Sequence, residues 1–271
     1  MCSLIDERHL TVWSGYSSND ADNVAGDVVH VLDLAATGGI WRAVQQDAVR
    51  PSDRDGGHMC SQRFADGSGP LLVAGLSNDQ SRTNDVWRLN PTSFKYEVVQ
   101  RNVLQPPARS GHSSVAVGRK MVVLFGEGPA GLLGDVWAFD VDTEQWEQLS
   151  SSCPFGGRVG ATALAQASSI WVVGGRLADG KATMEILFFD IVRRTWSLEA
   201  SSGAPAGRYW HSAALVDRAI LVVAGTTDTA SRTSEMYMFE PFTGTWSTVR
   251  QLPAPISIRR GDQHDVQRVR G

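Results

Sequence analysis

Several features that this sequence lacks narrow the classes of protein it can encode. Its 271 residues include only three cysteines, Cys2, Cys60 and Cys153, and no two of them are close in sequence. A disulfide framework and a Cys-x-x-Cys zinc site are therefore poor fits, and we expect a reducing, cytoplasmic location. No apolar run approaches the ~20 residues that cross a bilayer, so we expect no membrane association. The first residues carry acids early and do not match a secretory signal.

Basic residues are not in excess either. The chain has 25 lysines and arginines against 29 aspartates and glutamates, which gives a formal net charge of −4. Phosphate recognition needs a concentrated positive surface, so we do not expect nucleic-acid binding. The hydrophobic share of 42% is nevertheless large enough to bury a sizeable core.

The organising feature of the chain is an internal repeat. A short aliphatic run ends in glycine five times, at Gly15, Gly75, Gly126, Gly175 and Gly225, in steps of 60, 51, 49 and 50 residues. Each run is followed by an acid (Asp27, Asp85, Asp135, Glu185, Glu235) and then by an aromatic (Trp41, Tyr96, Trp146, Trp196, Trp246). A turn that contains arginine opens four of the units, at Arg54, Arg109, Arg158 and Arg208. The same landmarks in the same order indicate a repeat architecture.

Each unit predicts four short β-strands. In the third unit, the expected strands are 112–117, 121–125, 136–139 and 146–149. The second of these is almost entirely apolar, which is typical of a strand buried on both faces. Stretches with helical periodicity are missing, so we predict an all-β chain with almost no helix.

Four strands in roughly 50 residues are typical of a β-propeller blade, and the repeat resembles that of the kelch family. The resemblance rests on small residues paired after the second strand and on the spaced aromatic. It implies an all-β kelch-type β-propeller of about five four-stranded blades, in a closed ring or an incomplete, open one. The expected blades are 1–50, 51–105, 106–153, 154–204 and 205–250, and residues 251–271 are a tail or a partial sixth repeat.

Two details of the blades can be predicted. One blade cannot bury both of its faces, so the five aromatics should fill the spaces between neighbouring blades. A double glycine occurs only at Gly174-Gly175, and Phe125 stands at the first of these two positions in the third unit. Because a backbone with positive φ tolerates glycine best, we expect a distorted third blade.

No motif for catalysis is found in the sequence. Nucleophile-elbow, phosphate-loop and dinucleotide-binding patterns are missing, so we expect no catalytic residues and no cofactor. His58, His112 and His211 follow the recurring arginines and could converge as metal ligands near the innermost strands. The fourth unit has Ala161 at this position, and we predict instead that the histidines bond backbone carbonyls.

The recurring arginines are open to two interpretations. They could pair with the recurring acids, or they could contact a partner from the channel mouth. In kelch adaptors, partner contacts come from the turn before the first strand and from the position after the paired glycines. Carried over to this sequence, the candidate partner-binding residues are Tyr16, Arg54, Leu76, Arg109, Ser110, Glu127, Arg158, Val159, Arg176, Arg208, Tyr209 and Thr226.

The sequence therefore favours a non-enzymatic adaptor or scaffold that binds a protein or peptide partner through its loops. Unpaired blade edges also leave dimerisation open. The alternative is a kelch-type enzyme, a lyase, epimerase or metal-dependent oxidoreductase, acting at the channel mouth. A third interpretation is that the chain is one piece of a larger adaptor.

Overall fold

The computed structural model describes residues 2–4, 8–13, 28–36, 39–52, 54–55, 58–60, 69–77, 79–99 and 104–249. Every regular element in these ranges is a β-strand, and the same ranges contain no helix. Accordingly, no helix long and apolar enough to cross a membrane occurs in the described part of the chain. The prediction of an all-β fold is confirmed.

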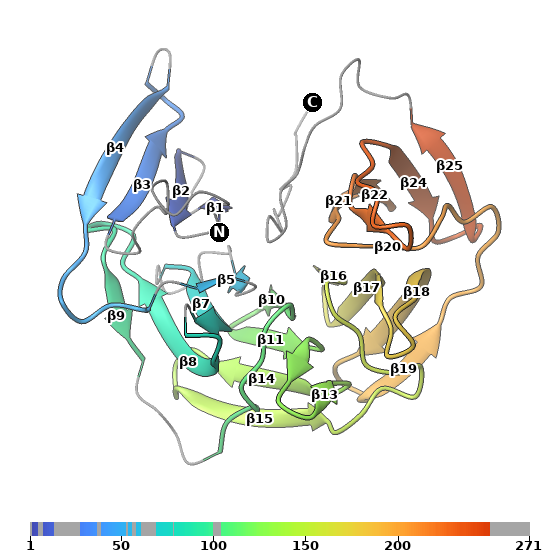
Figure 1. Cartoon of the computed structure of the whole chain (residues 1–271), viewed down its shortest axis with the longest axis horizontal. Coiled ribbons are helices and arrows are strands. Elements are labelled where there is room, and N and C mark those ends of the chain that lie inside the picture. The colour runs from blue at the N-terminus through green and yellow to red at the C-terminus, as the bar shows by residue number, and fades with distance from the viewer. Residues whose placement is uncertain are drawn as a thin grey trace.

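The strands form five blades, each with four antiparallel strands that follow one another in chain order. In the first, third, fourth and fifth blades, Figure 1 shows the first strand innermost and the fourth outermost. The blades are β1 (Cys2–Leu4), β2 (His9–Trp13), β3 (Val28–Asp33), β4 (Ile40–Gln45); β6 (His58–Cys60), β7 (Leu71–Ser77), β8 (Arg82–Leu89), β9 (Tyr96–Val98); β10 (Ser113–Val117), β11 (Lys120–Leu124), β14 (Val136–Asp140), β15 (Gln145–Ser150); β16 (Thr162–Gln166), β17 (Ser169–Arg176), β18 (Ala182–Asp190), β19 (Thr195–Leu198); and β21 (Ser212–Val216), β22 (Ala219–Val223), β24 (Met236–Glu240), β25 (Thr245–Val249).

Short strands extend the second, third and fifth blades at one end. In the second blade, β5 (Arg54–Asp55) pairs with the end of β7. In the third and fifth blades, β12 (Glu127–Gly128) pairs with β13 (Gly131–Leu132), and β20 (Arg208–Tyr209) pairs with β23 (Thr226–Thr227). These short ladders lie beside the turns that open the blades, which is where the candidate site lies.

The core consists of layers between neighbouring blades. Apolar side chains on both faces of the central strands form four clusters, which join blades one and two, two and three, three and four, and four and five. This agrees with the expectation that a blade needs a neighbour on each side to bury its faces. None of the four clusters among the described residues joins blades one and five, which lie at the two ends of the arc in Figure 1.

Four of the five recurring aromatics lie between blades as predicted. Tyr96, Trp146 and Trp246 are buried and Trp196 is half-buried, and each packs toward the preceding blade. The prediction is wrong for the fifth aromatic, Trp41, because 52% of its surface is exposed. The physical reason is its place in the first blade, where the described structure has no preceding blade for the indole to contact.

The third blade shows a local irregularity, a register shift between Val136 and Trp137 where β14 pairs with β15, but the second and fourth blades have comparable shifts. This blade has the same strand order as the others. Phe125 adopts a φ of 63°, close to the 61° of Gly174 at the equivalent position. Its ring is buried against Trp196, with 5.4 Å between the ring centroids, and 5.6 Å from the Arg158 guanidinium carbon. Interblade packing therefore holds a bulky residue in a backbone conformation that sequence reasoning reserved for glycine.

Candidate interaction face

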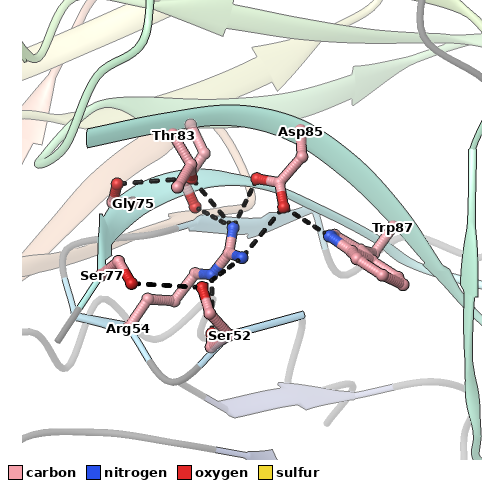
Figure 2. Close-up of polar contacts among 8 residues, drawn as sticks. Ser52, Arg54, Gly75, Ser77, Thr83, Asp85 and Trp87 are labelled. Carbon is pink, nitrogen blue, oxygen red and sulfur yellow. Dashed lines mark hydrogen bonds and ion pairs between the residues drawn. The ribbon is translucent and has the colours of Figure 1, made fainter. Parts of the chain in front are cut away.

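Each blade from the second to the fifth has one buried arginine in the turn before its first strand. Arg54, Arg109, Arg158 and Arg208 are only 0–2% exposed. In the second blade, the Arg54 guanidinium donates hydrogen bonds to both Asp85 carboxylate oxygens, at 2.6 and 3.0 Å (Figure 2). It also donates to the Ala74 carbonyl at 3.3 Å, while the Trp87 indole N–H donates to Asp85 at 2.6 Å. Burial acts to raise the pKa of Asp85, but these donors outweigh it and lower the pKa below its usual value.

The same arginine–acid pair recurs in the third, fourth and fifth blades, with hydrogen bonds of different number and length. Arg109 forms two bonds of 2.8 Å with the Asp135 carboxylate. Arg158 and Arg208 each form one longer bond, at 3.3 Å to Glu185 and at 3.4 Å to Glu235. Each of the three arginines also donates to the carbonyl of the first paired residue, Phe125, Gly174 or Ala224.

These contacts decide between the two interpretations of the arginines. Pairing with the recurring acids is confirmed, because a salt bridge joins each arginine to the acid of its own blade. Side chains with almost no exposed surface cannot contact a partner from this position. We therefore correct the prediction that Arg54, Arg109, Arg158 and Arg208 bind a partner, and assign them to holding the loops.

The remaining candidate residues are brought together in pairs. The position after each arginine lies opposite the position after the paired small residues: Asp55 opposite Leu76, Ser110 opposite Glu127, Val159 opposite Arg176, and Tyr209 opposite Thr226. The two sets that the kelch resemblance implied are therefore antiparallel neighbours at the same end of the second to fifth blades. Tyr16 lies outside the described residues.

Exposure divides this group further. Ser110 and Val159 are buried, whereas Leu76, Glu127, Arg176, Tyr209 and Thr226 are half-exposed. Polar contacts link adjacent blades, since Arg82 forms a salt bridge of 3.0 Å with Glu127. The Arg176 guanidinium carbon lies 5.6 Å from the centroid of the Tyr209 ring in the next blade.

Sequence reasoning missed one residue of this group, Trp210. It adopts a φ of 55°, at a position where the third and fourth blades have Gly111 and Gly160 with φ values of 61° and 67°. Its N–H donates to the Gly160 carbonyl at 2.8 Å, and the Gly160 N–H donates to that of Gly111 at 2.9 Å. A Cβ atom on Gly111 would lie 2.7 Å from the indole of Trp210, so the glycines make room for the ring. The break in the Arg-x-Gly pattern at Arg208-Tyr209-Trp210 was the signal that could have revealed it.

The half-exposed residues Arg82, Glu127, Arg176, Tyr209 and Trp210 are hereafter called the loop face. The surface combines one acid, two arginines and two aromatic rings, all on or next to segments held by the buried arginines. The positive φ of Trp210 strains its backbone by about 1–3 kcal/mol. Backbone strain of this kind is concentrated at functional sites.

The histidines lie deeper in the molecule. His112 and His211 are buried, and burial is the largest of the effects that lower the pKa of both rings, for His211 to about 3. A backbone hydrogen bond with Val73 for His112, and one with Val173 for His211, acts in the opposite direction and raises the pKa of each ring, which agrees with the predicted backbone contacts. His58 Nδ1 lies 2.6 Å from the Ser114 hydroxyl. The described residues include no group of three or more side chains that could ligate a metal.

Fold and repeat together define a five-bladed, kelch-type β-propeller. The chain belongs to the Attractin/LZTR1 β-propeller family, which matches residues 10–260. Among solved structures, the one described as the structure of YjhT is similar, with a TM-score of 0.74 and 17% sequence identity. The match covers 92% of this chain and 83% of that one. At this identity the likeness shows the fold alone. No curated protein is significantly similar to the chain.

Proposed function

We propose that this propeller is a non-enzymatic interaction module that binds a protein or peptide segment on its loop face. The observation that supports this most is the group formed by Arg176, Tyr209 and Trp210, where a guanidinium and two aromatic rings lie half-exposed on adjacent blades. Tyrosine, tryptophan and arginine are the side chains most enriched among the residues that dominate binding energies.

The rigidity of the loop face supports the same proposal. The turn that carries Tyr209 and Trp210 is held by the buried Arg208, which donates hydrogen bonds to the Ala206 and Ala224 carbonyls. Loops that are already ordered lose less conformational entropy when a partner binds, so more of the contact energy remains as affinity.

The chemistry of the loop face suggests the kind of segment it binds. The described contacts give Arg176 an aromatic neighbour but no carboxylate, so a carboxylate of the partner can form a two-pronged pair with its guanidinium. The Trp210 ring, which follows Tyr209 in the chain and packs over Gly111 and Gly160, offers an apolar surface on the same face. A peptide with an acidic side chain next to an apolar one therefore fits this surface best.

The test is partner capture from cell extract, followed by mass spectrometry, with the unchanged chain and three single variants as bait. Arg176→Ala and Tyr209→Ala should each reduce recovery of the specific partner by about tenfold or more, as expected for a residue worth over 1.4 kcal/mol. The control is Arg193→Ala, because Arg193 is an exposed arginine on the β18–β19 turn. Equal recovery with all baits, when circular dichroism shows them folded, would disprove the proposed face.

A further inference from the structure

The fifth blade, at one end of the arc in Figure 1, has a row of residues whose equivalents in other blades are buried against the next blade. Ser212, Val223 and Met236 lie opposite one another across β21, β22 and β24. The equivalent rows are Ser113, Leu124 and Val136 in the third blade and Thr162, Val173 and Ile186 in the fourth. The aliphatic residues of those rows are 0% exposed, whereas Val223 and Met236 are half-exposed. The adjacent pair is half-exposed as well, and the whole set is hereafter called the end face: Ser212, Leu221, Val223, Met236 and Met238.

The hydroxyl group in each row gives independent evidence about what the end face binds. The Ser113 hydroxyl donates a hydrogen bond of 2.6 Å to the Ala161 carbonyl of the fourth blade, and the Thr162 hydroxyl donates one of 2.8 Å to the His211 carbonyl of the fifth. Each acceptor directly precedes the inner strand of the next blade. Ser212 is only 3% exposed, but its Oγ has no hydrogen-bond partner among the described residues. Because a buried hydroxyl is destabilising until it is hydrogen-bonded, the end face favours an element that presents a backbone carbonyl here.

The first blade, at the other end of the arc, is also apolar on its outer side. Leu10, Leu32 and Trp41 lie opposite one another across β2, β3 and β4. The two leucines are half-exposed, and Trp41 is 52% exposed. The equivalent row of the fifth blade is 0%, 0% and 8% exposed, at Ile220, Phe239 and Trp246. An element that is apolar on both of its faces can therefore contact the end face and the first blade at once.

The size of the end face limits what can cover it. A stable interface between two globular proteins involves about 20–30 residues on each side, whereas the end face has four half-exposed apolar side chains. A second copy of the chain that docks through this face alone would bury too little surface for a stable dimer. A small element that packs as the next blade does is a better match, because it continues the contacts that join the third blade to the fourth and the fourth to the fifth.

We propose that the end face binds a β-hairpin of a different protein, which packs on the fifth blade as two inner strands of a next blade would. Between the fourth and fifth blades this role belongs to β21 and β22, where Ala213 and Val222 share a cluster with Val173 and Ile186. The hairpin therefore has small or aliphatic residues at alternate positions, and the carbonyl before its first strand accepts a hydrogen bond from Ser212 Oγ. A hairpin fits better than one strand, because its two strands satisfy each other's backbone groups.

The probe for the test is a fluorescein-labelled synthetic peptide with the sequence of residues 209–224, because this segment packs against the equivalent row of the fourth blade. Fluorescence anisotropy should show saturable binding of the peptide to the full-length chain. Val223→Asp in the protein should raise the Kd about tenfold or more, because it places a carboxylate against apolar side chains of the hairpin. Val192→Asp is the matched control and should leave the Kd unchanged, because Val192 is 76% exposed on the β18–β19 turn. A control peptide with Ala213→Asp and Val222→Asp should not bind.

A second measurement identifies what lies on the end face. A photoreactive benzophenone side chain replaces Met236, and mass spectrometry locates the cross-links formed in the presence of excess probe. Cross-links to the probe support the proposal, whereas cross-links to residues 250–271 of the same chain or to a second copy would overturn it. Absent binding, or an equal Kd for Val223→Asp and the unchanged chain, would also overturn it. Circular dichroism checks that each variant is folded, and Met238→Asp reports on the same face if Val223→Asp is not. None of these variants changes a loop-face residue, so a failure here does not count against the proposed function.

Discussion

Replacement of Arg109 by methionine should be among the most destabilising single changes on the loop side of the propeller. The guanidinium forms two bonds of 2.8 Å with Asp135 and one of 2.9 Å with the Phe125 carbonyl. Only 8% of the Asp135 side chain is exposed, so methionine leaves a carboxylate buried without its counterion. Removing one partner from a buried ion pair typically costs about 3–5 kcal/mol, and we expect a loss in this range.

Arg158→Met provides an internal comparison. Arg158 is as deeply buried as Arg109, but the side chain of its partner, Glu185, is 40% exposed and can be hydrated when the arginine is removed. The loss should then be dominated by hydrogen bonds to backbone carbonyls, and we expect about 2 kcal/mol. The difference between the two variants follows from the exposure of the acid, because the arginines themselves are equally buried.

Urea denaturation of the two variants and the unchanged chain, at pH 7 and followed by far-ultraviolet circular dichroism, measures both losses. The m-value should stay the same, because each variant exposes the same surface on unfolding. An equal loss for both variants, or a larger one for Arg158→Met, would refute the argument that the stranded carboxylate sets the cost. Either loss also means that variants of the four buried arginines are unsuitable for testing partner binding, because they weaken the fold.

Two further predictions concern burial. Burial and the neighbouring Arg208 lower the pKa of His211 to about 3, so below pH 6.5 the unfolded chain binds a proton that the folded chain does not, and stability falls. Lowering the pH from 7 to 5 should therefore reduce the free energy of unfolding by about 2 kcal/mol through this site. Urea titrations should show that His211→Gln does not undergo this loss. Trp146→Ala should lower the free energy of unfolding by about 3–5 kcal/mol, because Trp146 is buried. Trp41→Ala should lower it by less than about 1 kcal/mol, because Trp41 is mostly exposed. Equal shifts of the melting temperature would contradict this prediction.

The sequence was sufficient to predict the fold because the repeat constrains each blade several times over. The aliphatic run, the acid and the aromatic each recur at nearly constant spacing, and each has one structural role in every blade where a neighbour exists. Trp41 shows the limit of this reasoning. Its own position in the repeat is regular, but its burial depends on a neighbouring blade, which a pattern within one unit does not specify.

Recurrence also explains why some of the candidate partner-binding residues are buried and others are half-exposed. A residue needed to hold a blade together is needed in each blade, so Arg54, Arg109, Arg158 and Arg208 recur and are buried. A surface that recognises one partner has no reason to repeat fivefold. Leu76, Glu127, Arg176 and Thr226 occupy one equivalent position with four different chemistries, and Trp210 stands where two other blades have glycine. In a repeat protein of this kind, structural residues are therefore found from what recurs, and candidate contact residues from where the repeat is broken.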